Sequence, residues 1–183
     1  DLVSAAKANP GKFNYASAGI GGATHLNAEK FKLQAGFDAV HVPFKGTPEA
    51  ISDVIGGRSD WYFSPVSGAL PLVREGKLTA LAVSTPQRSP ILPQVPTTVE
   101  AGVPGSDYIF WVGMIAPGAT PPAVIKRLNE EAIKALNHPE VKERLTKLGA
   151  EGLPMTPEAF NAFIRTEMES AARIAQAASL KAN

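Results

Sequence analysis

The chain of 183 residues contains no cysteine, no long apolar run and no large excess of charge of either sign. The absence of cysteine excludes a disulfide scaffold, a thiolate zinc site and a cysteine nucleophile. No apolar stretch approaches the roughly 18 residues that a membrane-spanning helix needs. Lysine and arginine total 18 against 17 acidic residues, a net charge of +1. The basic stripe of a nucleic-acid-binding protein is therefore missing, and we expect no nucleic-acid partner.

The remaining composition is that of a folded globular chain. Hydrophobic residues make up 44% and charged residues 19%, which argues against disorder. The length predicts one domain or slightly more, and a chain of this size needs no metal or disulfide to complete its core. It opens on Asp1-Leu2 in a helical pattern with no signal peptide, so we expect a chain that has been processed or cut.

Glycines and prolines, 16 of each, divide the first 116 residues into alternating strands and helices. We expect helices at 2–8, 24–34, 47–55 and 65–75, and strands at 13–16, 37–44, 60–64, 78–84 and 108–116. The apolar run at 78–84 is typical of a strand covered on both faces. The alternation predicts an α/β fold with a Rossmann-like, mostly parallel sheet and helices on both faces. From residue 117 to the end the pattern is helical.

Residue types at the helix ends support these assignments. Thr47 is the expected hydroxyl N-cap of the third helix, Pro48 suits its first position, and Gly36 is the expected C-cap of the second helix. The same Thr-Pro pattern opens helices near Thr120 and Thr156 in the last third of the chain.

The segment 17–24 is the most informative part of the sequence for function. It joins a strand to a helix, carries three glycines and presents the hydroxyls of Ser17 and Thr24. A helix N-terminus preceded by such a loop offers unpaired N–H groups to a carboxylate or phosphate. Its glycine spacing matches neither a dinucleotide-binding fingerprint nor a P-loop, and a plain tight turn is the alternative. His25, which follows, either faces the site or caps its helix.

Two further strand-to-helix junctions would lie at the same edge of a parallel sheet. Ligands collect at the carboxyl ends of such strands, which would place Ser64, Ser67 and Lys45 beside the 17–24 loop. Helix capping by Ser64 or Ser67 is the alternative role for these hydroxyls.

Catalytic and metal-binding motifs are missing. The sequence has no G-x-S-x-G and no identifiable Ser-His-Asp arrangement, and its paired carboxylates lie on helix faces of ordinary charged character. The three histidines, His25, His41 and His138, stand at isolated positions that do not form a metal site, and His41 and His138 are expected to be structural. We therefore nominate no catalytic residue, metal ligand or cofactor.

Six segments, taken in order and spacing, resemble one known family, the solute receptors of tripartite tricarboxylate transporters, or Bug-type extracytoplasmic binding proteins. The segments are LVSAAKANPGKFNYASAG (2–19), THL (24–26), HVPFKG (41–46), GKLTALAV (76–83), VPTTVEAGVPG (95–105) and APGATPP (116–122). The match runs nearly from end to end of the chain.

The resemblance implies a two-lobed receptor that closes on a small carboxylate. Residues 1–111 are then the second, ligand-binding lobe of a fold like that of the type II periplasmic binding proteins. Residues 112–183 are the hinge strand and C-terminal helices that complete the first lobe, most of which is absent from this chain. Such helices would expose apolar faces, and a dimer formed through them is one expected outcome.

The resemblance also carries over a set of ligand-binding residues. These are Ser17, Ala18, Gly19, Gly21, Gly22, Ala23, Thr24 and, beside them, His25, Lys45 and Ser64. Many relatives have an aspartate where this chain has Ser64, a position that would suit a ligand ammonium. Its absence favours a carboxylate without an α-amino group, such as a dicarboxylate, a hydroxy acid or an aromatic acid.

The function implied is capture of this carboxylate in the periplasm and delivery to a membrane permease, without catalysis. One alternative is a small α/β enzyme that handles a phosphate or coenzyme A, for which His25 is the only base that we can nominate. The other is a ligand-sensing module of a larger regulatory assembly.

Overall fold

The computed structural model describes residues 1–180, so the last three residues of the predicted segment 112–183 lie outside the description. The elements in chain order are α1 (Leu2–Ala8), β1 (Asn14–Ser17), α2 (Ala23–Ala35), β2 (Val40–Pro43), α3 (Thr47–Ile55), β3 (Trp61–Tyr62), α4 (Val66–Arg74), α5 (Pro122–Asn137), α6 (Pro139–Lys147) and α7 (Pro157–Ala177). The chain divides into two compact units, one of Asp1–Phe110 with the chain from Ala172 onward, and one of Trp111–Ala171.

A three-stranded parallel sheet lies at the centre of the first unit, in the order β2-β1-β3. Tyr15 of β1 pairs with His41 of β2 and with Trp61 of β3. Because paired residues of parallel strands point to the same side, these three side chains share one face of the sheet. The α/β fold with a parallel sheet is therefore as predicted, although the sheet is smaller.

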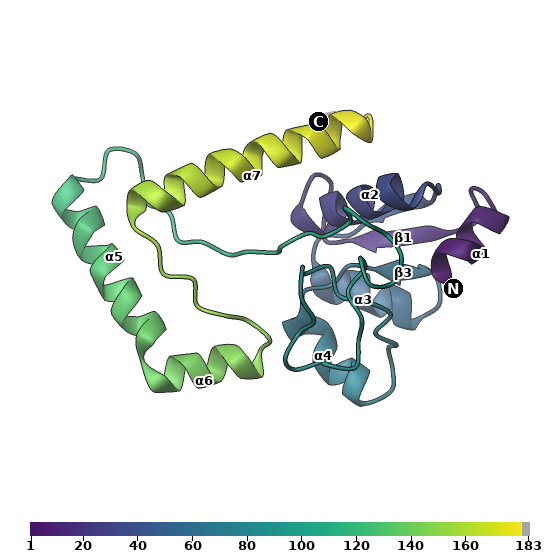
Figure 1. The fold of residues 1–183 in the computed structure, drawn as a ribbon, viewed down its shortest axis with the longest axis horizontal. Coiled ribbons are helices and arrows are strands. Elements are labelled where there is room, and N and C mark those ends of the chain that lie inside the picture. The colour runs from purple at the N-terminus through teal and green to yellow at the C-terminus, as the bar shows by residue number, and fades with distance from the viewer. Residues whose placement is uncertain (181–183) are drawn as a thin grey trace. The chain divides into compact units, whose positions relative to one another are not determined.

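Helices cover both faces of this sheet (Figure 1). Residues of α2 pack on the Tyr15 face, whereas α3 contacts β1 and β3 from the other side. The main core lies under α2 and is rich in aromatic rings: Tyr15, Phe31 and Trp61 are buried, and Phe37 and Phe63 pack against them. The Trp61 ring lies 5.0 Å from that of Tyr15 and 5.7 Å from that of Phe63, centroid to centroid.

The capping residues of α2 and α7 are those predicted from the sequence, whereas the residue predicted to cap α3 has a different role. Gly36 caps α2 in the left-handed conformation with φ of 67°, as predicted. The N-cap of α3 is Gly46, whereas Thr47 is already helical and places its Oγ1 3.1 Å from the hydroxyl of Tyr62. At α7 the expected cap forms, because the N–H of Ala159 donates to Thr156 Oγ1.

The two apolar runs predicted as strands at 78–84 and 108–116 are not strands, and those predictions were wrong. Within the described residues, the first run makes a single bridge, from Val83 to Thr97, and the second makes none. Leu81 is 57% exposed and Val112 is 87% exposed. An apolar run indicates a tendency to be buried but does not supply the neighbouring strand that a ladder requires.

A second, smaller core holds the irregular connection after α4. Leu70 of α4 packs with Val83, Leu92 and Val95, all of them buried. This cluster anchors the proline-rich segment to the first unit and positions the chain that leads to residue 110.

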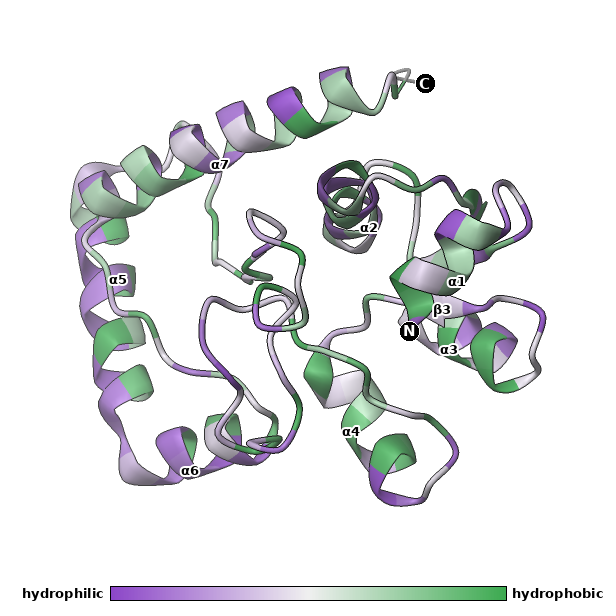
Figure 2. Ribbon diagram, turned by 45° about the vertical axis from the view of Figure 1, so that its right-hand side comes forward, coloured by the Kyte–Doolittle hydropathy of each residue, from purple (hydrophilic) through white to green (hydrophobic). Residues whose placement is uncertain are grey.

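The unit of Trp111–Ala171 has a different character. None of its residues, all of which the structure describes, is buried. Figure 2 shows hydrophobic and hydrophilic residues alternating along α5, α6 and α7, as in amphipathic helices. Its one aromatic cluster consists of Trp111 against Phe160 and Phe163, with the indole N–H donating to Glu167. No helix of the described residues is long and apolar enough to cross a bilayer.

Candidate ligand-binding site

The carboxyl ends of the three parallel strands meet at one edge of the sheet. Ser17, Pro43 and Tyr62 end β1, β2 and β3. The N–H of Phe44 donates to the carbonyl of Ser17 at 2.9 Å, which joins the junction after β2 to the loop after β1. The chain runs from β1 to one neighbour and then crosses to the other, so the strand order reverses at β1. A reversal of this kind is where open α/β sheets bind ligands.

The loop at 18–22 adopts a conformation that requires glycine. Gly19 has φ of 141° and Gly21 has φ of 73°, both in the region that L side chains rarely adopt. Gly22 is the N-cap of α2 and has no side chain to satisfy the first N–H groups. The N–H of Ala18 donates to Thr24 Oγ1 at 3.0 Å, which closes the loop onto the helix.

The first turn of α2 offers hydrogen-bond donors at this edge. Among the described residues, the N–H groups of Ala23 and Thr24 have no acceptor within the protein. Gly21 and Gly22, which precede them, are exposed. Unpaired N–H groups at the positive end of a 13-residue helix favour an anion. The loop therefore presents two free N–H groups at the strand ends, and no carboxylate of the described residues accepts a hydrogen bond from them. The anion site itself stays a prediction.

The hydroxyl of Thr24 braces the site instead of facing solvent. Thr24 is 6% exposed, and its hydroxyl also bonds Tyr62. Burial raises the pKa of Tyr62, while the hydrogen bonds from Thr47 and Thr24 lower it. Sequence analysis missed Thr47 and Tyr62, which join the junctions after β2 and β3. The packing of α3 beside β3, which brings them together, has no signal in the sequence of either segment alone.

His25 turns inward. Its side chain is 2% exposed, and its Nδ1 accepts the N–H of Gly21 at 3.0 Å. Burial lowers the pKa of this imidazole, the nearby Glu29 carboxylate raises it, and Lys32 lowers it. His25 therefore fixes the loop from beneath and does not project toward a ligand.

His41 is brought to the same place by the strand register. Its Nε2 lies 2.6 Å from Ser17 Oγ, and its ring stacks on that of His25 with centroids 3.7 Å apart. The expectation that the histidines stand isolated was wrong for this pair. Burial, followed by the neighbouring His25, lowers the pKa of His41 to about 4. The period-two pattern that places Tyr15 and Ser17 on one strand face is the signal that could have suggested this contact.

The Ser17–His41 contact resembles a nucleophile with its base but lacks what catalysis needs. Ser17 is fully buried, and its hydroxyl is also within 3.2 Å of both the N–H and the carbonyl of Gly19. A nucleophile must reach its substrate, and this oxygen is enclosed by its own loop. The contact is therefore a structural brace.

Lys45 and Ser64 lie at the same edge but are not joined to the loop. The backbone N–H of Lys45 donates to Glu49, and its side chain is exposed. The hydroxyl of Ser64, half-buried, donates to the carbonyl of Pro65 at 3.1 Å. Beside them a hollow of about 590 Å³ opens between α3 and α4, with Thr47 and Ser67 in its lining.

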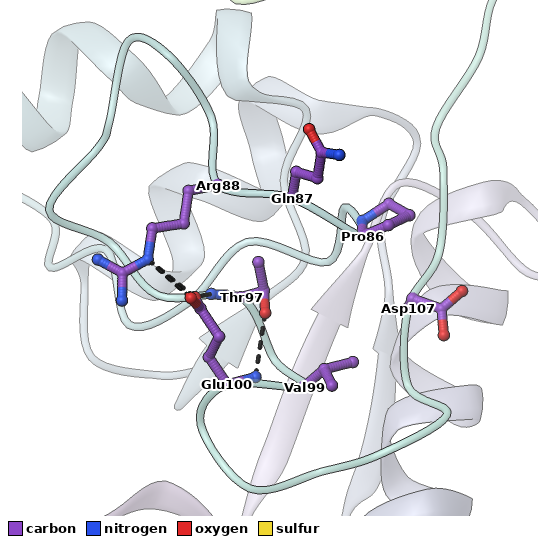
Figure 3. Close-up of a pocket in the computed structure, with 7 residues that line it drawn as sticks. All are labelled: Pro86, Gln87, Arg88, Thr97, Val99, Glu100 and Asp107. Atoms are coloured by element: carbon purple, nitrogen blue, oxygen red, sulfur yellow. Dashed lines mark hydrogen bonds and ion pairs between the residues drawn. The ribbon is translucent and has the colours of Figure 1, made fainter.

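A second hollow, of about 480 Å³, lies on the irregular segment and is lined by Arg88, Thr97, Glu100 and Asp107 among others (Figure 3). The Arg88 Nε lies 2.8 Å from the Glu100 carboxylate, which also accepts the N–H of Thr97. The Thr97 N–H, and then Arg88, lower the pKa of Glu100. Arg88 and Glu100 are thus paired with each other, and Asp107 lies 3.9 Å from the Lys30 ammonium. None of the sequence-predicted site residues lines this hollow.

Comparison with known proteins shows the family of the chain. The model of the TctC family, the tripartite tricarboxylate transporter family receptor, matches residues 1–180. The chain belongs to this family.

Two curated relatives come from Pseudomonas and Bordetella. The chain is 38% identical over 169 residues to the UPF0065 protein in the tcbD-tcbE intergenic region of Pseudomonas sp. (strain P51), covering 92% of this chain and 50% of that protein. It is 33% identical over 168 residues to Protein BugT of Bordetella pertussis (strain Tohama I), covering 92% of this chain and 52% of that protein. The chain thus spans about half the length of these relatives.

Solved structures of the same family share the fold. R. palustris Rpa4515 with adipate matches with a TM-score of 0.89 and 29% identity, over 97% of this chain and 60% of that one. The periplasmic binding protein BugD matches with a TM-score of 0.85 and 32% identity, over 98% and 61%. MatC (Rpa3494) from Rhodopseudomonas palustris with bound malate matches with a TM-score of 0.79 and 31% identity, over 97% and 60%. The resemblance found in the sequence is confirmed.

Proposed function

We propose that this chain supplies the ligand-gripping part of a periplasmic solute receptor, which captures a small carboxylate and delivers it to the permease of a tripartite tricarboxylate-type transporter. The observation that carries the proposal is the pair of unpaired N–H groups, on Ala23 and Thr24, at the positive end of α2. They lie where the three parallel strands end and the strand order reverses.

The chemistry favours a carboxylate without an amino group. Carboxylate oxygens accept hydrogen bonds from backbone N–H groups, directly or through water. Ser64 offers no negative charge to hold an ammonium, and the exposed Lys45 would add positive charge at the same edge. Relatives of similar fold were solved with adipate and with malate, two dicarboxylates.

The residues support binding over catalysis. A general base needs a free lone pair within reach of the substrate, and the Nδ1 of His25 is already occupied by Gly21. Ser17, whose hydroxyl lies 2.6 Å from His41 Nε2, is buried. The proposed role is therefore a receptor whose closed state binds the ligand more tightly than the open state, so that closure signals occupancy to the permease.

Residues 112–183 are proposed to complete the first lobe, and a dimer through the exposed C-terminal helices stays a prediction. The exposed apolar residues of these helices include Val124 and Leu128 of α5 and Met168 of α7. Light scattering over a dilution series tests the dimer: a mass that falls to that of one chain on dilution supports it, and a monomer at every concentration contradicts it.

The function is tested by thermal unfolding against a panel of mono-, di- and tricarboxylates, aromatic acids, and aspartate and glutamate as amino-acid controls. A ligand present at a hundred times its Kd stabilises the chain by about 2.7 kcal/mol, or several degrees. Selective stabilisation by dicarboxylates, hydroxy acids or aromatic acids supports the proposal. Stabilisation that requires the amine of aspartate contradicts the ligand class, and no stabilisation by any acid contradicts the receptor role of this chain.

A matched pair of variants locates the binding. Gly22→Asp places a carboxylate at the N-cap of α2, where φ of −73° accepts any residue. Asp is a favourable N-cap, so the free chain keeps its stability or gains a few tenths of a kcal/mol. The acid-induced stabilisation is lost, because the new charge occupies and repels the anion site. Gly118→Asp, which adds the same charge at an open position in the other unit, leaves the stabilisation unchanged.

A further inference from the structure

The two stacked imidazoles beneath the 18–22 loop have no part in the binding chemistry described above, yet they hold the loop at two points. His25 accepts the N–H of Gly21, and His41 contacts the hydroxyl of Ser17, which in turn contacts Gly19 on both its N–H and its carbonyl. Gly19 and Gly21 are the two loop residues with positive φ. The pair therefore braces the two positions where the loop has the greatest conformational freedom.

We propose that His25 and His41 are positioning residues: as a neutral stacked pair they hold the 18–22 loop in its anion-binding conformation, and acid releases it. The part of this inference that concerns ligand binding rests on the proposed function. The part that concerns the conformation of the loop does not depend on it. In this proposal neither residue contacts the ligand, and their effect is exerted through the backbone of the loop.

The surroundings of His25 select one neutral tautomer. Its Nδ1 must be unprotonated to accept the Gly21 N–H, so the proton is on Nε2. That nitrogen faces the Glu29 carboxylate, with Nε2 and Oε1 3.8 Å apart. Glu29 also accepts hydrogen bonds from Tyr15 and from Lys32. The carboxylate thus favours the neutral tautomer of His25 whose proton is on Nε2, the nitrogen that points away from the loop.

Each group that faces the two imidazoles either favours their neutral state or has its own charge paired with that of another residue. Tyr15 stacks on His41 with ring centroids 4.9 Å apart and is neutral. Burial, and then Glu29, raise the pKa of the Tyr15 hydroxyl. Lys32, the nearest cation, pairs with Glu29 at 2.9 Å. Two protonated imidazoles with centroids 3.7 Å apart would repel, so His25 and His41 resist protonation together.

Protonation of His25 removes the brace directly. An imidazolium donates from both nitrogens, so Nδ1–H would meet the N–H of Gly21 instead of accepting it. Gly21 then loses its partner, and the peptide before the N-cap is free to rotate. Both pKa values are lowered by burial, so the loop is held at neutral pH and is released only in acid.

The first test needs no ligand. Nuclear magnetic resonance of the wild-type chain at pH 7.5 should show an unprotonated His25 Nδ1, a scalar coupling from it to the Gly21 amide nitrogen, and slow exchange of that amide. As the pH is lowered, protection of the Gly21 amide should disappear together with the titration of His25. The proposal is overturned if Nδ1 is protonated at pH 7.5, or if the protection of the Gly21 amide does not change as His25 titrates.

Two variants separate the acceptor from the ring. His25→Asn keeps an acceptor oxygen at about the position of Nδ1 and does not titrate, whereas His25→Phe keeps a ring for stacking and has no acceptor. We expect the Gly21 amide to stay protected in His25→Asn down to acid pH. In His25→Phe it should exchange roughly tenfold faster or more. Equal protection in His25→Phe and wild type contradicts the positioning role, and the wild-type titration decides the question if His25→Phe does not fold.

The ligand arm uses adipate and malate as probes. If either binds, its affinity should fall about tenfold or more in His25→Phe and stay within about threefold in His25→Asn. Between pH 7.5 and pH 5 the wild-type affinity should fall further than that of His25→Asn. Equal affinity in all three proteins contradicts the link from loop to ligand. Failure of the wild type to bind any acid contradicts the proposed function, while the amide measurements still decide the role of His25.

Discussion

The two units of this molecule are built from similar local signals and differ in what they bury. In Asp1–Phe110, aromatic rings from β1, α2 and β3 pack into a closed cluster around Trp61, which is 6% exposed. In Trp111–Ala171, helices begin at prolines and carry ion pairs one turn apart, such as Arg127–Glu131, but no residue is buried. Capping and spacing are thus sufficient to define helices, whereas a core is needed to define a site.

The difference explains why every element of the candidate site comes from the first unit. A loop that presents free N–H groups must be held against thermal motion by buried neighbours, and Ser17, Thr24 and His25 are all buried. Exposed helices offer no such support. The comparison predicts that equivalent changes in the two units have unequal effects.

The largest expected contrast is between the two tryptophans. Trp61→Ala removes an indole that packs against Tyr15, Phe31 and Phe63, and should lower the free energy of unfolding by about 3–5 kcal/mol. Trp111→Ala removes a half-buried ring and should change the main transition by about 1 kcal/mol or less. Urea denaturation followed by circular dichroism measures both. Equal losses would show that the second unit has a core of its own.

The next contrast concerns pH. His41 has a pKa of about 4 in the folded chain and about 6.5 when unfolded, so between these values the unfolded state binds more protons. Stability is therefore greatest above pH 6.5 and falls as the pH drops toward 4. This group accounts for about 2 kcal/mol between pH 7 and pH 5. His25, whose pKa is also lowered, adds in the same direction.

His41→Gln keeps a polar group near Ser17 and does not titrate, so it should flatten the pH dependence of unfolding. The matched control is His138→Gln, which makes the same substitution at the exposed N-cap of α6, outside the first unit. Urea midpoints measured at pH 7, 6 and 5 decide the matter. An unchanged slope in His41→Gln would show that His41 titrates freely.

Most helices and the glycine-rich loop between β1 and α2 could be predicted because their signals are local. The Thr-Pro starts of α3, α5 and α7 lie within a few residues of the predicted bounds, and Gly36 ends α2 where expected. The 17–24 loop was found from its glycines and from its place between a strand and a helix. These features depend on backbone conformation and on neighbours in sequence, which composition and spacing record.

What could not be predicted depends on partners far apart in the sequence. The contact of His41 with Ser17 follows from the register of β2 on β1, and the Thr47–Tyr62 bond follows from the packing of α3 beside β3. The apolar runs at 78–84 and 108–116 resemble buried strands, yet strand formation requires a neighbour that hydropathy cannot identify. The error at these segments and the missed contact at the site have the same origin.

The smallest contrast concerns two helix-ending glycines. Gly36 follows α2 with φ of 67°, and Gly149 follows α6 with φ of 70°. Gly36→Ala should lower the free energy of unfolding of the first unit by about 1 kcal/mol, because a side chain disfavours this conformation. Gly149→Ala should leave that transition unchanged and reduce only the helical signal of the second unit. Thermal unfolding of both variants measures the effect, and equal shifts would contradict independence of the two units.

The central claim is that the N-terminus of α2 binds a small carboxylate. The most direct measurement is a map of backbone amide shifts in the labelled chain on addition of adipate or malate. The account predicts that the Ala23 and Thr24 amides shift most, with smaller changes at Gly21 and Gly22, and that the shifts saturate. Shifts centred instead on Arg88 and its neighbours, or no saturable shift with any acid of the panel, would contradict it.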